Sequence, residues 1–417
     1  MDNTMLRVLG IRSFFALWLA EVFSQIAMNM ANFILIILAF KFTSSNTAVS
    51  GVVIAFTMPA ILFGLLAGVY VDRWNKKTVL NLTNLMRAGI LILILLFPHN
   101  LFVLYLVTFV MSIVTQFFIP AETPMIPQIV PKELLLSANA LFGMGIYGSM
   151  LIAYALSGPS LLFFGETHIF VFLAVLFVIA SFFVSFIRVS KQKGMPVSLS
   201  PTLMEEVKGA LSLVTKTKRI SHSLFLLTLS SLLILTFAVI GPGYAKQILD
   251  ISVEEFPLMF VAPAAMGMVF GAVFLSNIKK QSFKEKSVLY GIFLSSIGLF
   301  LLPFCSKAAT KGLFQELNNI LPAFLSINIF HIVILLAFLL GIANAFVFVP
   351  SNTILQEETS DEFRGKIYGF LNSLIGAVSL LPIIVVGGLA DVFGVAKVLI
   401  GISISLVIIG MYFLATQ

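Results

Sequence analysis

Two ionisable side chains, Glu21 and Arg87, interrupt long apolar stretches of the sequence, 13–40 and 78–97. Each lies about nine residues into its stretch, which at 1.5 Å per residue places both roughly 14 Å from the same end. Burial favours the neutral form of a lone carboxyl group, whereas a neighbouring arginine favours the ionised form. A movement that separates the two would therefore drive proton uptake. A static buried ion pair, or an arginine reaching back to water, is the alternative.

A stripe of polar residues follows Glu21 along the same segment. The spacings from Glu21 of four, four and three residues place the stripe on one face of a helix. Such a face is unsuited to lipid and predicts a lining for a central substrate cavity; hydrogen bonding between helices is the alternative. The predicted cavity residues are Gln25, Asn29 and Asn32 on this stripe, with Gln116, Tyr147, Asn344 and Asn372 from other segments.

The composition indicates which elements must hold these groups. Of 417 residues, 59% are apolar and 10% are charged, against about 45–50% and about 25% in water-soluble domains. Such a chain would expose too much apolar surface in water, so we predict an all-α membrane protein. The net charge of +7 is explained by basic loops beside a membrane, and no nucleic-acid partner is expected.

Apolar runs of membrane-spanning length divide the chain into two halves of six predicted spans each. We expect an N-terminal six-helix bundle over 1–190, a cytoplasmic central loop with an amphipathic helix over 191–221, and a C-terminal six-helix bundle over 222–417. The predicted spans are 13–40, 47–71, 78–97, 101–119, 137–163, 169–187, 223–245, 256–276, 287–304, 329–350, 365–390 and 395–415.

Basic residues are unevenly divided between the two sides of this arrangement. With the N-terminus inside, the outer loops hold few of them: Lys41, Lys246, Lys307, Lys311 and Lys397. The excess of Lys and Arg on the other side predicts that both termini are cytoplasmic. We expect a multi-pass protein of a prokaryotic inner membrane, and a monomer.

The two halves resemble each other in sequence. GLLAGVYVDRWNKK from Gly64 and GMVFGAVFLSNIKK from Gly267 both carry GxxxG followed by Lys-Lys at matched spacing. Segments from Pro120 and Pro350 share a proline exit, an acidic hinge and a glycine re-entry. Parallel six-span repeats are a transporter architecture, with the substrate path between the halves. The repeat therefore predicts alternating access.

The turn GVYVDRWNKKTVL after the second predicted span resembles the G-x-L-a-D-r-x-G-r-k-x-x-l signature of the major facilitator superfamily. The matching residues are Gly68, Asp72, Arg73, Lys76, Lys77 and Leu80. Asn75 replaces the second glycine, and Asn tolerates the left-handed conformation that a turn needs. The resemblance implies that Asp72 and Arg73 latch helix ends and gate transport. A plain basic turn is the alternative.

Two further segments resemble parts of that superfamily. Gly158 and Pro159, in the fifth span, partly match a Gly-Pro motif of its exchangers and exporters, although a helix kink is an equal explanation. The loop from Pro350 to Gly369 resembles that of drug and siderophore exporters. The fourth span has no basic residue, so the arginine motif that the family carries there is absent.

These features predict a proton-coupled exporter, an antiporter of small amphipathic molecules, in contact with membrane lipid. No G-x-x-x-x-G-K-[ST] phosphate loop is present, so ATP hydrolysis is not expected. We expect no enzyme activity, no cofactor and no metal. A lysophospholipid translocase of the same fold is one alternative, and a non-transporting membrane receptor or scaffold is another.

Overall fold

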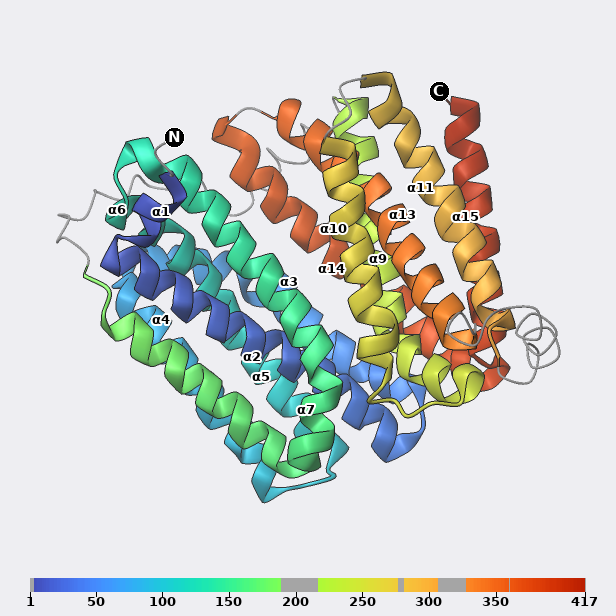
Figure 1. The fold of residues 1–417 in the computed structure, drawn as a ribbon, viewed down its shortest axis with the longest axis horizontal. Helices are drawn as coiled ribbons and strands as arrows, with labels where there is room; N and C mark the ends of the chain where they lie inside the picture. The colour runs from blue at the N-terminus through green and yellow to red at the C-terminus, as the bar shows by residue number, and fades with distance from the viewer. Residues whose placement is uncertain (1–3, 189–216, 277–280, 307–327, 360, 417) are drawn as a thin grey trace, which may run out of the picture. The chain divides into compact units, whose positions relative to one another are not determined.

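The computed structural model describes residues 4–188, 217–276, 281–306, 328–359 and 361–416. The described chain is helical, which confirms the predicted all-α class, and its contacts divide it into two units (Figure 1). Unit 1 is Met1–Leu38 and Ile54–Met204; unit 2 is Ala39–Val53 and Glu205–Gln417. The short segment Ala39–Val53, from the first half of the sequence, thus packs with the second half.

The helices of the first half alternate long apolar segments with short connecting turns. They are α1 (Thr4–Leu9), α2 (Arg12–Thr43), α3 (Asn46–Arg73), α4 (Lys76–Ile92), η1 (Leu93–Leu96), α5 (Leu101–Glu122), η2 (Thr123–Met125), α6 (Ile126–Ile129), η3 (Lys132–Leu134) and α7 (Leu135–Ser185).

The second half is built in the same way. It contains α9 (Lys218–Tyr244), η4 (Ala245–Leu249), η5 (Pro257–Val261), α10 (Ala262–Ser276), α11 (Gln281–Leu301), η6 (Leu302–Phe304), α13 (Ile329–Glu357), α14 (Asp361–Phe393) and α15 (Val395–Thr416). Of the predicted central loop, residues 191–216 lie outside the described residues, and Lys218 already begins α9.

Eleven helical segments of the described chain are long and apolar enough to cross a membrane. One of them, α7, has 51 residues, about 76 Å at 1.5 Å per residue, which is more than twice the roughly 30 Å of a bilayer core. Within α7, Gly165 has φ 71° and ψ 171°, which glycine adopts without strain. The chain reverses there, so α7 contains two crossings and the described chain makes twelve.

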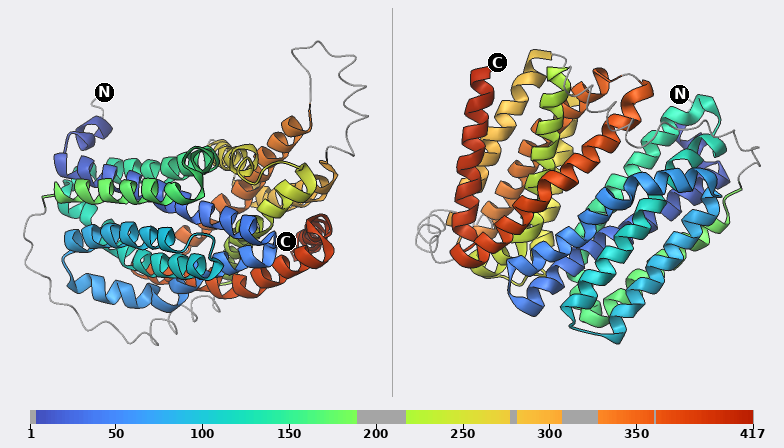
Figure 2. Two further views of the ribbon diagram at one scale, coloured as in Figure 1. Left: turned by 90° about the horizontal axis from the view of Figure 1, so that it is seen from below. Right: turned by 180° about the vertical axis from the view of Figure 1, so that it is seen from behind.

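Unit 1 packs α4 against both α5 and α7, and its apolar core gathers residues from α1 through α7. In unit 2, α13 packs against α9, α10 and α11, and α11 also packs against α15 (Figure 2). Large apolar side chains on the outside include Phe163, which is 84% exposed, and Val392, which is 74% exposed. Such surfaces fit hydrocarbon better than water.

Capping side chains explain where several helices begin. Asn75 is extended, with φ −68° and ψ 111°, and its side chain accepts a hydrogen bond from the Thr78 backbone N–H. The expectation of a left-handed Asn75 was wrong, because asparagine here satisfies an N–H at a helix start. Asn100 and Asn328 cap α5 and α13 in the same manner.

Candidate functional site

A cluster of buried polar groups lies inside unit 1, where α2, α4 and α5 present side chains to one another. Glu21 on α2 is fully buried, Arg87 on α4 is 1% exposed and Glu122 on α5 is 5% exposed. Both carboxyl groups are near enough to the guanidinium to interact with it electrostatically. The cluster therefore places one cation beside two acids.

Hydroxyl and amide groups fix the arginine from the side of α2. The Arg87 Nη1 donates to Ser24 Oγ at 3.0 Å, and Ser24 Oγ donates to Asn84 Oδ1 at 2.9 Å. The Asn84 Nδ2 donates to the Leu80 carbonyl oxygen at 3.0 Å. This chain of bonds joins α2 to α4 and holds the guanidinium in one orientation.

Aromatic rings cover the same guanidinium. Its Cζ lies 4.4 Å from the centroid of the Phe118 ring on α5 and 5.6 Å from that of Phe177 on α7. A cation over an aromatic face is stabilised, and more so away from water. The rings also exclude water, so Arg87 depends on its few polar partners.

The polar groups of the cluster are incompletely satisfied. Arg87 Nε and Nη2 and Glu21 Oε2 are buried without a hydrogen-bond partner. Arg87 is thus close to the carboxyl groups but not hydrogen-bonded to them. Unmet donors and acceptors in such a place are costly.

The stripe predicted along α2 forms a ladder of hydrogen bonds. Gln25 Nε2 donates to Glu21 Oε1 at 2.8 Å. Asn29 Nδ2 donates to the Gln25 carbonyl oxygen at 2.8 Å and lies 3.3 Å from Gln25 Oε1. Asn32 is half-buried further along the helix. The side-chain amides of Gln25 and Asn29 thus extend the hydrogen bonding of the Glu21 carboxyl group along one face of α2.

Other residues predicted to line the cavity have hydrogen-bond partners outside this ladder. Gln116 on α5 donates to the Ser112 carbonyl oxygen of its own helix at 3.2 Å. Asn344 on α13 accepts a hydrogen bond from Ser230 on α9 and lines a small cavity inside unit 2. The side chains of Tyr147 and Asn372 lie outside what the structure describes.

Of the five predicted gating residues, Lys76 and Lys77 have described side chains. Lys77 Nζ donates to the Ser185 carbonyl oxygen at 2.7 Å, so it binds the end of α7 from the start of α4. Cations are favoured at such helix ends. Lys76 is half-buried, and the side chains of Gly68, Asp72 and Arg73 lie outside the described part.

The Gly158–Pro159 motif lies within the continuous part of α7. Gly158 is buried and Pro159 is exposed. The residue with non-helical backbone angles is Gly165, six positions after Pro159 in the sequence. A kink at the motif itself is therefore not what reverses the chain.

Sequence reasoning missed Asp391, near the end of α14, which caps the start of α3. Its carboxylate accepts from the backbone N–H groups of Asn46 and Thr47 at 2.7 and 2.9 Å. The side chains of Ser45, Asn46 and Thr47 donate to it at 2.6, 2.9 and 2.7 Å. All these residues belong to unit 2, and a carboxylate at a helix N-terminus is favoured by charge.

A signal for this cap was present in the sequence. Gly387 precedes Asp391 by four residues, the spacing that separates Gly68 from Asp72. A Cβ atom on Gly387 would lie 2.1 Å from Ser50 Oγ, so the glycine is what lets α14 approach α3. Ser50 Oγ also donates to the Ile383 carbonyl oxygen at 2.8 Å.

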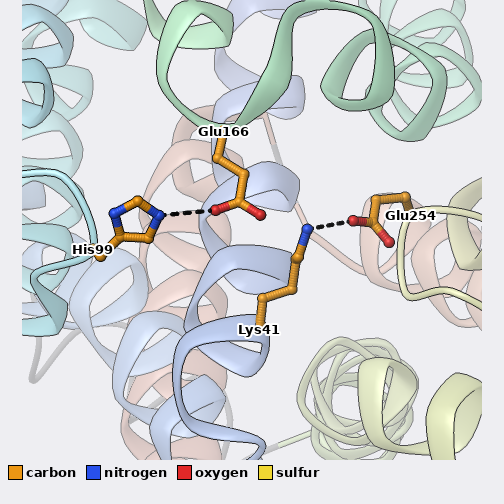
Figure 3. A network of polar contacts seen from close by, with 4 residues as sticks. All are labelled: Lys41, His99, Glu166 and Glu254. Atoms are coloured by element: carbon orange, nitrogen blue, oxygen red, sulfur yellow. Dashed lines mark hydrogen bonds and ion pairs between the residues drawn. The ribbon is translucent and has the colours of Figure 1, made fainter.

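Figure 3 shows two polar contacts outside the buried cluster, one in each unit. In unit 2, Lys41 Nζ lies 2.6 Å from Glu254 Oε1 and ties the end of α2 to the segment before η5. In unit 1, His99 Nε2 lies 3.2 Å from Glu166 Oε2, and the His99 side chain is 62% exposed. The Glu254 side chain is only 9% exposed, so we expect its pair to be the stronger.

Comparison with known proteins identifies the family. The family model described as Major Facilitator Superfamily matches residues 17–381. The chain belongs to this superfamily. It is therefore a membrane transporter, as its residue pattern predicted, and the major facilitator fold is confirmed.

Curated relatives are similar at low identity. Macrolide efflux protein A of Streptococcus pyogenes is 23% identical over 390 residues, which cover 92% of this chain and 90% of the relative. The uncharacterised MFS-type transporter YkuC of Bacillus subtilis is 24% identical over 314 residues, covering 70% of this chain and 71% of that protein.

Solved structures share the fold. The nucleoside transporter NupG matches with a TM-score of 0.74 and 12% identity, covering 96% of this chain and 98% of that one. A bacterial homologue of the human lysosomal transporter Spinster, inward-facing and unoccupied, matches with a TM-score of 0.70 and 14% identity, covering 100% and 97%. These matches show the fold.

Proposed function

We propose that this transporter works by alternating access and exports small amphipathic molecules in exchange for protons. The observation that carries the proposal is the buried cluster of unit 1, in which Glu21 and Arg87 lie close together without a hydrogen bond. An ionisable group inside a membrane helix is expensive and is a functional candidate by default. A carboxyl group that gains and loses its arginine partner can take up and release a proton.

The relatives support export. Macrolide efflux protein A aligns with nine tenths or more of this chain, and its name describes an exporter of macrolides. The Gly158–Pro159 pair of α7 matches part of a motif that exporters of the superfamily carry. A macrolide is an amphipathic molecule, so it is the first substrate to test.

The distribution of basic residues supports an inner-membrane protein with both termini in the cytoplasm. In that orientation the start of α3 and the end of α14, where Asp391 caps α3, face outward. Alternating access needs polar contacts that can break and re-form at one end of the molecule. The Asp391 cap and the Lys41–Glu254 pair, both within unit 2, are polar contacts at this end.

The proposal is tested with inside-out vesicles whose lumen is made acidic. Uptake of a macrolide and of amphipathic dyes is compared for wild type, Glu21→Gln and Glu133→Gln, because Glu133 is an exposed carboxylate of the same half. We expect energised uptake in wild type and Glu133→Gln, and its loss in Glu21→Gln.

Failure would take one of two forms. Unchanged uptake by Glu21→Gln would contradict coupling through this carboxyl group. If wild type moved no dye or macrolide, the exporter assignment would be wrong, and transfer of lysophospholipid between leaflets would be the next measurement.

A further inference from the structure

The third ionisable member of the buried cluster, Glu122, has no part in the pair proposed above. It lies on α5 one helical turn after Phe118, and the Phe118 ring covers the Arg87 guanidinium at 4.4 Å. Residues four apart share a helix face. Glu122 therefore faces the same pocket as Arg87, and it is 95% buried, since only 5% of its surface is exposed.

Glu122 also interacts with Glu21. Both acids are buried, both interact with the Arg87 guanidinium, and their carboxyl groups are near enough to repel each other when both are ionised. An ionised carboxylate only accepts hydrogen bonds, so a bond between two carboxyl groups requires one of them to carry a proton. Sharing a proton also removes the repulsion between two acids that are held together away from water.

The charges around the pair can be counted. The electrostatic partners of Arg87 are Glu21 and Glu122, and those of Glu122 are Glu21 and Arg87. From the packed helices, α2 adds the neutral Ser24 and Gln25, α4 adds Asn84, and α7 adds the Phe177 ring. With one proton between the two acids the cluster is neutral, and without it the cluster carries one net negative charge, which burial disfavours.

We propose that Glu21 and Glu122 together hold the transported proton, and that Arg87 takes the carboxylate released when that proton leaves. The inference rests on the proton-coupled function proposed above and names the site of coupling. Arg87 Nε and Nη2, now without partners, are the donors that can receive this carboxylate. Such a bond would draw α4 toward α2 or α5, and its loss on reprotonation would release them.

Infrared spectroscopy of the purified protein in detergent tests the shared proton without any assay of transport. A protonated carboxyl group gives a C=O stretching band that a carboxylate lacks. We expect a band at neutral pH in wild type and in Glu133→Gln that is absent from both Glu21→Gln and Glu122→Gln. Either single change leaves one acid beside Arg87, which favours its ionised form.

Transport then tests coupling. In proteoliposomes we expect Glu122→Gln to lose uptake driven by a pH gradient while keeping substrate counterflow, an exchange without net proton movement, within about twofold of wild type. The Glu21→Gln/Glu122→Gln double variant should be no worse than either single variant, as expected for residues that act as a unit.

The outcomes separate the two proposals. A band that persists in Glu122→Gln, or pH-driven uptake at the wild-type level in that variant, would overturn the shared site while leaving export through Glu21 intact. A wild-type protein with the band but without driven uptake would refute the proposed export and keep the shared proton. Loss of counterflow in Glu122→Gln, with a folded protein, would make Glu122 a substrate-binding residue and would also overturn the inference.

Discussion

The two units differ in what they bury within their membrane helices. Unit 1 encloses Glu21, Arg87 and Glu122. Glu21 and Arg87 each have buried side-chain atoms without a hydrogen-bond partner. The buried polar residues described in α9, α11, α13, α14 and α15 are serine and threonine: Ser223, Thr228, Ser230, Thr236, Ser287, Ser295, Ser296, Ser351, Ser379 and Ser403.

This difference has a physical consequence. Several of the hydroxyl groups in unit 2 bond to carbonyl oxygens of their own helix, as Thr228 does to Leu224 and Ser351 to Val347. Serine and threonine hydroxyl groups are neutral at every physiological pH. Within unit 2, α10 and α13 are also in close contact through glycine. We infer that unit 1 responds to protons, whereas unit 2 provides a packed scaffold.

The largest effect is expected from filling the glycine contact of unit 2. A Cβ atom on Gly267 would lie 1.9 Å from the Phe338 carbonyl oxygen, and one on Gly341 would lie 1.8 Å from that of Ala264. Both obstacles are backbone, so Gly267→Leu must push α10 from α13. Overpacking a core commonly costs about 1–3 kcal/mol, and backbone separation costs more.

We expect Gly267→Leu to abolish the monodisperse folded protein, measured by size-exclusion chromatography and thermal unfolding. Gly401→Ala on α15 is the control, because nothing lies within 4 Å of its Cβ position. Equal stability of the two variants would show that the scaffold does not depend on this contact.

Removal of the buried cation is the next largest change. Arg87→Gln leaves two buried acids without a positive charge beside them. Removing one partner from a buried set of charges in this way lowers the free energy of unfolding by about 3–5 kcal/mol. Protonation of the acids removes the unpaired charge, so the deficit relative to wild type should shrink as the pH falls.

Thermal unfolding of Arg87→Gln at acidic and neutral pH measures this effect. Adding Glu122→Gln to Arg87→Gln should restore part of the lost stability, since it removes one of the unpaired acids. A deficit independent of pH, with no rescue, would remove the distinction between the two units.

A smaller effect is expected at the α3 cap. Asp391→Ala removes the acceptor of five hydrogen bonds to Ser45, Asn46 and Thr47. Loss of a helix N-cap costs about 0.5–2 kcal/mol. We expect a lower unfolding temperature together with faster hydrogen exchange in the first turn of α3; exchange unchanged there would mean that the N–H groups find other partners.

The last comparison is between two hydroxyl groups, one in each unit. Ser24→Ala in unit 1 removes the acceptor of Arg87 Nη1 and the donor to Asn84, whereas Thr228→Ser in unit 2 keeps the hydroxyl that bonds to Leu224. A hydrogen bond to a charged group is worth about 1.5–3 kcal/mol. Ser24→Ala should therefore lower the unfolding temperature more than Thr228→Ser, and the reverse order would contradict the comparison.

Local sequence was sufficient to predict much of the fold. Apolar runs located the spans because a helix that crosses a bilayer must be long and apolar. Both properties can be read from consecutive residues in the sequence. Glu21 and Arg87 were recognised because a charged residue inside an apolar run has no opposite charge near it in the sequence. Glu122 was missed because Pro120 was taken as the end of the fourth span, whereas α5 continues through the proline to Glu122.

The sequence by itself determined the membrane class, the repeated halves and the presence of an acid and a base inside apolar helices. Only the tertiary structure decided which groups meet: Glu122 with Glu21 and Arg87, and Asp391 with the start of α3, 345 positions away in the sequence. Periodicity reports which face of a helix is polar, but contacts between distant helices depend on how whole helices pack. That packing is set by close approach at residues such as Gly387, and a local pattern does not identify the helix that such a glycine will meet.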